Sequence, residues 1–307
     1  MQASPPNPVS ALPPAGDASE PAWRCGRFRL VLDRVLLMGV LNVTPDSFSD
    51  GGQYADPQAA LAHAQQMVED GAAIIDVGGE STRPGAPVVS AEDELARVLP
   101  VLRALRDLPV PVSIDTSEPM VMRAALDLGA AIINDVRALR RPGALDVASA
   151  SRDCGVVLMH MSGEPATMQR EPYYGNVLRE VIDWLAQRRD LALSAGIAPG
   201  RVVLDPGFGF GKTQGHNRQL LAGLAQLQGL GHPVLVGLSR KSTLGELTGR
   251  PVTQRLPASL AAALIAAQNG ARIVRVHDVG ATRDALAVWE AFESDRRSTA
   301  GVGAAQQ

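Results

Sequence analysis

The stretch that decides the fold is LLMGVLNVTPDSFSDGG, which runs from Leu36 to Gly52. Its first part is apolar at consecutive positions, as in a parallel strand that is covered on both faces. The apolar run stops at the amide Asn42, and mostly small, polar and turn-forming residues continue to Asp56. A loop this long in a compact chain is usually functional or disordered, with an ordinary surface loop as the alternative. The stretch therefore predicts a buried strand that ends in Asn42, followed by a functional loop.

The rest of the chain repeats an apolar run and then a helical segment. The strand-like runs lie at residues 36–42, 72–79, 110–117, 130–136, 155–161, 201–207, 233–240 and 272–278. The helical segments lie at residues 57–70, 92–106, 119–128, 142–150, 177–195, 216–226, 257–268 and 281–293. Residues 27–32 and 34–37 predict a short N-terminal hairpin. Eight such units predict a (β/α)₈ TIM barrel; a doubly wound sheet is the alternative and usually has fewer strands.

Composition sets the domain limits and excludes some functions. Residues 1–22 are rich in Pro, Ala and Ser, and we expect a disordered tail there, a single barrel domain over 23–294, and a second disordered tail over 295–307. The net charge of −3 argues against a nucleic-acid partner, and no apolar run is long enough to span a membrane. Cys25 and Cys154 show neither metal-site nor disulfide-framework spacing, which fits a cytoplasmic protein.

Polar side chains recur where the predicted strands end. Five glycines that precede strands are each followed, five residues later, by a polar residue: Asp76, Asn134, His160, Asp205 and Arg275. Asp115 takes the same place in the third strand without the glycine. The carboxyl ends of barrel strands form one face, where ligands bind. The pattern therefore predicts a site at that face.

The residue types indicate what this site binds. Asp115, Asn134 and Asp205 together suit a flat heterocycle that carries N–H donors and a carbonyl, although each alone could cap a backbone amide or pair with Arg. Arg275 and His277 are two apart, so they share one side of a strand and suit an anion such as phosphate. The alternative is an internal ion pair for Arg275 and a buried structural role for His277.

The glycine-rich segment from Gly207 to Thr213 is not a phosphate-binding P-loop, because Pro206 stands where the motif requires glycine. We interpret Phe208 and Phe210 as aromatic walls, with packing on the barrel rim as the alternative. Among 29 basic residues only Lys212 and Lys241 are lysines, and both follow strand-like runs. A compact ammonium differs from a planar guanidinium, so both lysines invite a functional interpretation.

The strand-end motifs closely resemble those of the bacterial dihydropteroate synthase family. These motifs are MGVLNVTPDSFSDGG, IIDVGGESTRPG, SIDTS, IINDV, LMHM, LDPGFGFGK, GLSRKS and IVRVHDV, in this order over roughly residues 27–293. The resemblance implies a pterin-binding TIM barrel. It also implies condensation of 6-hydroxymethyl-7,8-dihydropterin pyrophosphate with p-aminobenzoate, which gives 7,8-dihydropteroate and pyrophosphate for folate synthesis. Mg²⁺ is the implied cofactor, sulfonamides are implied inhibitors that imitate p-aminobenzoate, and a homodimer through the last helices is implied.

The resemblance also assigns roles to residues of this chain. It implies that the pterin is bound by Asp115, Asn134, Asp205 and Lys241, and that the pyrophosphate is bound by Asn42, Arg275 and His277, with Asn42 also a metal ligand. It implies that p-aminobenzoate is bound by Phe48, Thr82, Arg83, Pro84, Phe210 and Ser239. The implied catalytic residues are Asp115, Lys241, Arg275 and His277.

Two rivals remain for the function. One is a pterin-binding methyltransferase domain on the same barrel, which should lack TPDSFSDGG, STRPG and the lysine of SRKS, all present here. The other is a non-catalytic pterin-binding paralogue, which should have lost Asn42, Arg275 or His277, and none is lost. Residues 44–50 are expected to form a lid that becomes ordered when the pterin binds.

Overall fold

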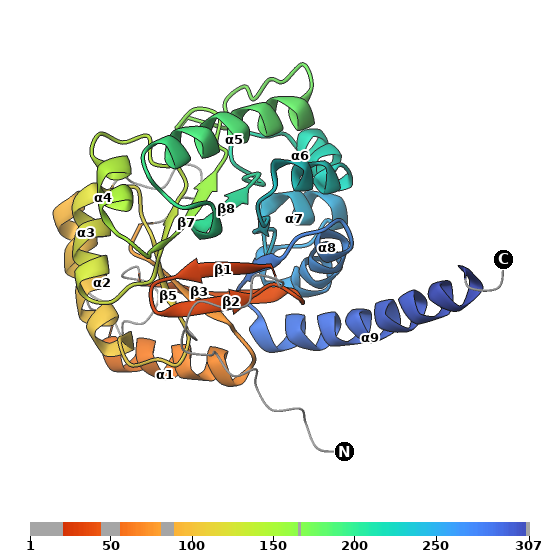
Figure 1. Ribbon diagram of the computed structural model, residues 1–307, viewed down its shortest axis with the longest axis horizontal. Helices are drawn as coiled ribbons and strands as arrows, with labels where there is room; N and C mark the ends of the chain where they lie inside the picture. Colours follow the sequence, from red (N-terminus) through yellow and green to blue (C-terminus); the bar gives the residue numbers. More distant parts are fainter. Residues whose placement is uncertain (1–20, 44–55, 81–88, 165–166, 305–307) are drawn as a thin grey trace.

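The protein is a parallel β-barrel with helices around it, seen in a computed structural model that describes residues 21–43, 56–80, 89–164 and 167–304, with side chains up to Arg296 (Figure 1). The barrel strands are β3 Leu36–Asn42, β4 Ile74–Gly78, β5 Val112–Asp115, β6 Ile132–Asp135, β7 Gly155–Met159, β8 Val202–Asp205, β9 Leu235–Val236 and β10 Ile273–Val276. Their order is β8-β7-β6-β5-β4-β3-β10-β9, and a parallel bridge between Leu204 and Val234 joins the two ends. The predicted (β/α)₈ fold is confirmed.

Alternate residues of each strand serve two hydrophobic layers, which explains why the strands read as continuous apolar runs. In β3, Leu37 and Leu41 belong to the layer that packs against the surrounding helices. Leu36 and Met38 belong to the layer inside the barrel. A strand buried on both faces has no polar alternation, so the pattern at Leu36–Leu41 is the one that a barrel strand requires.

The helices lie outside the barrel and follow the strands in turn. They are α1 Pro57–Glu69, α2 Ala91–Leu105, α3 Pro119–Asp127, α4 Ala144–Ala150, α5 Val177–Ser194, α6 Gln214–Ala222, α7 Ser242–Thr248, α8 Leu256–Gln268 and α9 Val279–Ala304, with short 3₁₀ turns η1 Pro199–Arg201, η2 Leu224–Leu230 and η3 Val252–Gln254. The predicted starts at Asp56 and Ser90 are confirmed, because each side chain accepts a backbone N–H of the first helical turn. The sequence prediction missed α7, whose N-cap position, Lys241, makes no side-chain cap hydrogen bond.

The N-terminal hairpin lies earlier in the chain than predicted. It pairs β1 Ala22–Cys25 with β2 Phe28–Val31, so the turn is Gly26-Arg27 and the prediction of residues 27–32 with 34–37 was wrong. Gly26 has a φ of +56°, which a two-residue hairpin turn requires and glycine provides readily. Trp23 is fully buried in the inner layer, and its indole N–H donates to Arg201 O at 2.8 Å. The hairpin therefore caps the barrel from outside the sheet.

The last helix is longer than predicted. It was expected over 281–293 with a tail from residue 295, but α9 continues to Ala304 and extends away from the barrel (Figure 1). The sequence from Asp295 to Ala300 contains neither Pro nor Gly, and Arg296 pairs with Glu293 at 2.6 Å on the same helix face. Similarly, Ala22 belongs to β1 rather than to the predicted N-terminal tail, of which residues 1–20 lie outside the described residues. No described helix is both long and apolar enough to cross a membrane.

Candidate active site

Three strands, β4, β5 and β10, bring together an arginine and two carboxylates, although β3 lies between β10 and β4. Arg275 on β10 donates from Nε to Asp76 Oδ2 at 2.6 Å and from one terminal nitrogen to Asp115 Oδ2 at 2.8 Å. Asn134 on β6 donates to the same Asp76 oxygen at 3.0 Å. Asp76 thus fixes both Arg275 and Asn134 through one carboxylate oxygen. Residues that are far apart in sequence become one hydrogen-bonded group.

Two carboxylates share one guanidinium in this group, and that arrangement sets its electrostatics. Burial raises the pKa of Asp115 to about 7, although Arg275 opposes the shift. Burial alone would lower the pKa of Arg275, but the carboxylates of Asp76 and Asp115 raise it overall, so Arg275 stays charged. The site therefore holds a permanent cation and a carboxyl group that changes its charge near neutral pH.

A second group lies where β8 and β9 end. Asp205 Oδ1 accepts a hydrogen bond from Gly207 N at 2.7 Å, and Lys241 Nζ donates to Phe208 O. Lys241 Nζ also lies 4.7 Å from the centre of the Phe210 ring, which is cation–π distance. Burial raises the pKa of Asp205 and lowers that of Lys241 to about 8, and in each case the other residue opposes the shift.

Two glycines, Gly78 and Gly237, lie next to these side chains and carry no side chain of their own. A Cβ at Gly78 would lie 3.8 Å from Asp115 Oδ2 and 3.9 Å from Asn42 Oδ1. A Cβ at Gly237 would lie 3.9 Å from Lys241 Nζ and 3.7 Å from Arg275 Cβ. Asp115, Asn42, Lys241 and Arg275 therefore border backbone positions that carry no side chain.

The ends of β9 and β10 are tied together at their side chains. Ser239 Oγ accepts from His277 N at 3.2 Å and lies 3.0 Å from His277 Nδ1. Next to them, Arg240 binds Asp278 with two hydrogen bonds, at 3.0 and 2.5 Å. Ser239 and His277, which were predicted to serve different substrates, are thus direct neighbours.

Comparison with known proteins identifies the family. The chain matches the model described as pterin binding enzyme over residues 38–277. The dihydropteroate synthase of Neisseria meningitidis serogroup B (strain MC58) is 52% identical over 276 residues, which cover 88% of this chain and 97% of the relative. The chain belongs to the dihydropteroate synthase family.

Solved structures of this family share the fold. A dihydropteroate synthase from Xanthomonas albilineans with 4-aminobenzoic acid has a TM-score of 0.84 and 52% identity, covering 90% of this chain and 99% of that one. One from Yersinia pestis in a sulfonamide drug complex has a TM-score of 0.85 and 47% identity, covering 89% of this chain and 99% of that one. The fold similarity therefore extends over nearly the full length of these two dihydropteroate synthases.

Most sequence-predicted site residues fall within the described part of the chain and lie at one barrel face. These are Asn42, Asp115, Asn134, Asp205, Phe210, Ser239, Lys241, Arg275 and His277. Phe48 lies within 44–55 and Thr82, Arg83 and Pro84 lie within 81–88, outside the described residues, as does the expected lid. Of the two expected aromatic walls, Phe210 lies beside Lys241, whereas Phe208 is fully buried in the core, so that interpretation of Phe208 was wrong.

The roles assigned from sequence left out Asp76, which binds Arg275 and Asn134, and Lys212, which binds the loop that carries Phe210. Asp76 carried a usable signal, since it has the same five-residue spacing from a glycine as Asn134 and Arg275. Lys212 was noticed as one of two lysines but was given no role, and burial lowers its pKa to about 7 with Asp205 opposing the shift. Local spacing cannot reveal which carbonyl groups a lysine reaches.

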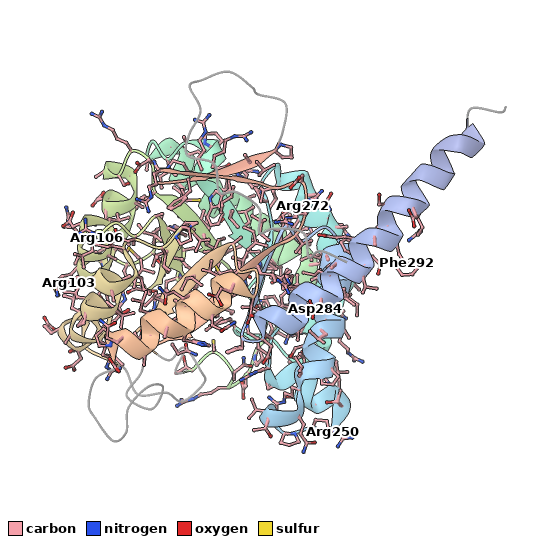
Figure 2. All side chains as sticks on the ribbon, turned by 90° about the horizontal axis from the view of Figure 1, so that it is seen from below. Arg103, Arg106, Arg250, Arg272, Asp284 and Phe292 are labelled. Carbon is pink, nitrogen blue, oxygen red and sulfur yellow. The ribbon has the colours of Figure 1, made fainter. Side chains whose placement is uncertain are left out.

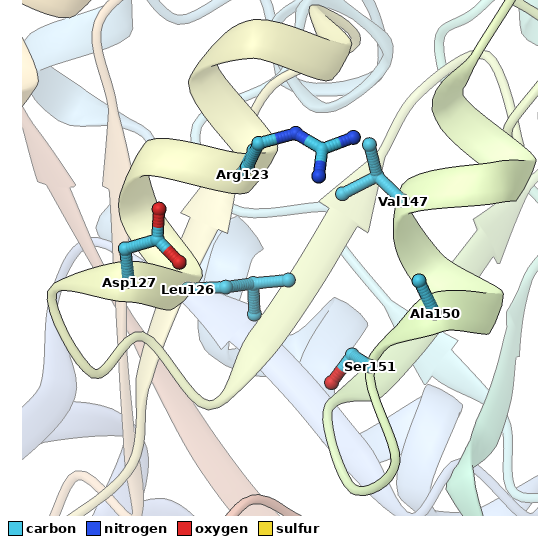
Figure 3. A pocket seen from close by; sticks show the side chains of 6 residues that line it. All are labelled: Arg123, Leu126, Asp127, Val147, Ala150 and Ser151. Atoms are coloured by element: carbon cyan, nitrogen blue, oxygen red, sulfur yellow. The ribbon is translucent and has the colours of Figure 1, made fainter.

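A separate groove of about 260 Å³ lies between α3 and α4 on the outside of the barrel (Figure 3). It is lined by Arg123, Leu126, Asp127, Val147, Ala150 and Ser151, as labelled there. Asp127 ends α3 and Ala150 ends α4, so the groove lies toward the amino ends of the strands. In barrel enzymes that side serves stability, and the chemistry occurs at the other face.

Proposed function

We propose that this chain condenses 6-hydroxymethyl-7,8-dihydropterin pyrophosphate with p-aminobenzoate to give 7,8-dihydropteroate and pyrophosphate, and is thus a transferase of folate synthesis. The observation that carries the proposal is the placement of Asp115, Arg275 and Lys241 together at the carboxyl face, beside the glycines Gly78 and Gly237. It provides hydrogen-bond partners for a heterocycle and a cation for its leaving group. The family's name, the 4-aminobenzoic acid bound to one relative and the sulfonamide bound to another support the same substrates and inhibitor class.

The pterin ring is recognised by Asp115, Asn134, Asp205 and Lys241. Carboxylates accept the ring's N–H groups, and the ammonium of Lys241 donates to its carbonyl or ring nitrogen. A site built from such groups discriminates strongly, because a ligand that lacks one partner leaves a buried polar group unpaired. The hydrogen bond of Asp205 to Gly207 N supports this role, since it orients the carboxylate before the ligand arrives.

The pyrophosphate is bound by Asn42, Arg275 and His277. Within the described residues, no cluster of three His, Cys, Asp or Glu side chains is placed to bind a metal. Mg²⁺ usually keeps several waters and is bound by few protein ligands together with substrate phosphates. The Asn42 amide oxygen, which lies beside Gly78, fits that pattern. When bound, Mg²⁺ neutralises charge on the pyrophosphate.

The reaction requires no covalent bond to the enzyme. The C–O bond to the pyrophosphate breaks with both electrons leaving on oxygen, while Arg275 and His277 stabilise the departing anion. Asp115, in its ionised form, stabilises the pterin-methylene cation that remains. The amine nitrogen of p-aminobenzoate then attacks the methylene carbon and loses a proton. Asp115, Lys241, Arg275 and His277 are therefore the proposed catalytic residues.

The p-aminobenzoate site is proposed at Phe48, Thr82, Arg83, Pro84, Phe210 and Ser239, with sulfonamides binding in the same place. Phe210 and Ser239 support it, because they flank Lys241 and His277 respectively. Residues 44–50 are proposed to close over the bound pterin and exclude water, which would otherwise compete with the amine.

We also infer how the chain is organised. A single pterin-binding barrel domain over 23–294 and a cytoplasmic location remain predictions, the latter resting on two free, buried cysteines. A homodimer through α8 and α9 is supported by apolar side chains that these helices expose. Val288 and Phe292 on α9 are 60% and 69% exposed, and Figure 2 shows Phe292 on the part of the helix that leaves the barrel.

The reaction is tested by mixing purified protein with Mg²⁺, the pterin pyrophosphate and p-aminobenzoate, and measuring pyrophosphate. We expect release that depends on p-aminobenzoate. Arg275→Met should abolish it, whereas Arg123→Met, in the groove between α3 and α4, should not. No release from the native chain with both substrates present would refute the synthase. Release without p-aminobenzoate would instead indicate a hydrolase.

A further inference from the structure

Lys212 is a buried cation that the proposed reaction does not use. Its Nζ lies 2.8 Å from Gly207 O, 3.1 Å from Phe210 O and 3.0 Å from His160 Nδ1, with His160 O at 3.4 Å. Among the described residues, Lys212 forms no ion pair with a carboxylate. A buried ammonium that is satisfied by carbonyls and an imidazole holds those groups in fixed positions.

These acceptors lie on one loop and at the end of the neighbouring strand. Gly207 and Phe210 are the first and last residues of this loop, the Gly207–Phe210 loop, which is the first part of the glycine-rich segment after β8, and His160 follows β7. Burial lowers the pKa of His160, with Lys212 adding to the shift, so the imidazole is neutral and its Nδ1 can accept. Lys212 therefore closes the loop on itself and attaches it to β7.

The other lysine contacts the same loop from inside the site. Lys241 Nζ donates to Phe208 O, and it lies above the Phe210 ring. Phe208 and Phe210 lie within the span that Lys212 closes. The position of Lys241 Nζ thus depends on a loop whose shape depends on Lys212.

The geometry also explains why this position is a lysine in a chain that otherwise uses arginine. Gly207 O, Phe210 O and His160 Nδ1 converge on one point, which suits a compact ammonium with three directed protons. A planar guanidinium spreads its donors over several ångströms and cannot replace it. Both lysines among the 29 basic residues therefore bind one loop.

We propose that Lys212 is a positioning residue, which acts through the Gly207–Phe210 loop to place Lys241 and Phe210 for substrate binding. Naming the pterin as the ligand of Lys241 rests on the proposed function, but the positioning itself does not.

The test uses the fact that the chain contains two lysines. With ¹³C-labelled lysine, the full-length protein gives two side-chain ε-methylene signals, and the Lys241 signal is assigned with Lys241→Arg. The Phe210 ring shifts that signal upfield. Lys212→Met keeps a long unbranched side chain and removes its charge. In this variant we expect the Lys241 signal to move downfield. Affinity for 6-hydroxymethyl-7,8-dihydropterin should fall on the order of tenfold or more, as for a lost charged hydrogen bond.

Two further variants make the result decisive. His160→Phe keeps a ring beside Trp184 but removes one acceptor of Lys212, so it should move the Lys241 signal in the same direction by less. It decides the matter if Lys212→Met does not fold. Arg201→Met is the matched control, because Arg201 is also a buried cation that donates to carbonyls, those of Cys154, Ser151 and Ala148. It should lower the melting temperature and leave the Lys241 signal unchanged.

The outcomes separate this inference from the proposed reaction. An unchanged Lys241 signal in folded Lys212→Met, or in His160→Phe, would overturn the positioning role. A different outcome combines two measurements: the Lys241 signal moves in Lys212→Met, but the unsubstituted protein binds no pterin. That outcome would support the positioning role and reject the proposed function.

Discussion

At Asp115 the structure places a buried carboxylate beside a second one, with Arg275 as their common partner. Burial raises the pKa of Asp115 from 3.8 to about 7. A raised pKa means that the folded state binds the proton more tightly than the unfolded chain. Stability from that proton is complete below about pH 4 and is lost as the pH rises through 7.

Asp115→Asn should therefore be more stable than the native protein at neutral pH, by ~1 kcal/mol or more, with little difference near pH 4. Turnover should fall on the order of 10²-fold, since the pterin-methylene cation loses its carboxylate. Urea unfolding at several pH values measures the first effect, with Asp127→Asn, on the exposed side of α3, as the control. A stability difference that does not change with pH would contradict the raised pKa.

Which strand-end residues belong to the site could be predicted from sequence, because barrel topology places the carboxyl end of every strand at one face. That is why Asp115, Asn134 and Arg275 were found without coordinates. The contacts among them could not be predicted: Arg275 reaches Asp76, 199 positions away in the sequence. Which carboxylate pairs with which cation is decided by the order and tilt of the strands, and periodicity does not encode either.

Among the elements, the glycine-rich loop after β8 has a shape that side chains would prevent. Gly207 has a φ of +69°, and a Cβ there would lie 1.9 Å from His160 O. Gly129 has a φ of +94° and open space around that position. Both glycines have positive φ angles, so alanine at either position is strained in the backbone. Only alanine at Gly207 would also clash with His160 O.

Gly129→Ala should cost ~1–2 kcal/mol of unfolding free energy, and Gly207→Ala ~3 kcal/mol or more, because the loop must also move away from His160. Pterin affinity should fall only in Gly207→Ala, since the displaced loop carries Lys241's partner Phe208 O. Chemical denaturation and calorimetric binding measure the two effects. Equal losses of stability in both variants would show that the contact with His160 O is relieved at little cost.

Elements with strong periodicity and caps were predicted well, and elements that depend on tertiary contacts were not. The starts of α1 and α2 were predicted because the N-cap side chains, Asp56 and Ser90, accept hydrogen bonds from their own helices. The hairpin was misplaced because Leu36 and Leu37, although apolar, pair with β10 rather than with β2. The short helix α7 carries too few residues to show a helical period, and its place is set by packing against α6 and α8.

For the whole molecule, the long helix α9 is the feature that a single barrel does not explain. It extends away from the barrel (Figures 1 and 2). It exposes Val288 and Phe292, which are four residues apart and so lie on one helix face. A contiguous patch of exposed apolar side chains marks an association surface, and these two side chains are the proposed centre of one. In a two-fold dimer each contact forms twice, so one substitution alters both halves of the interface.

The native chain should therefore sediment as a dimer, and Val288→Asp combined with Phe292→Asp should sediment as a monomer. Burying these charges in the interface would cost more than the apolar contacts they replace. Leu191→Asp, on α5, makes a similar change at a side chain that is 50% exposed, and it should leave the dimer intact. Because the residues of the proposed site come from one chain's barrel, the monomeric variant should retain pterin binding. A native monomer, or a double variant that still forms dimers, would place the interface elsewhere.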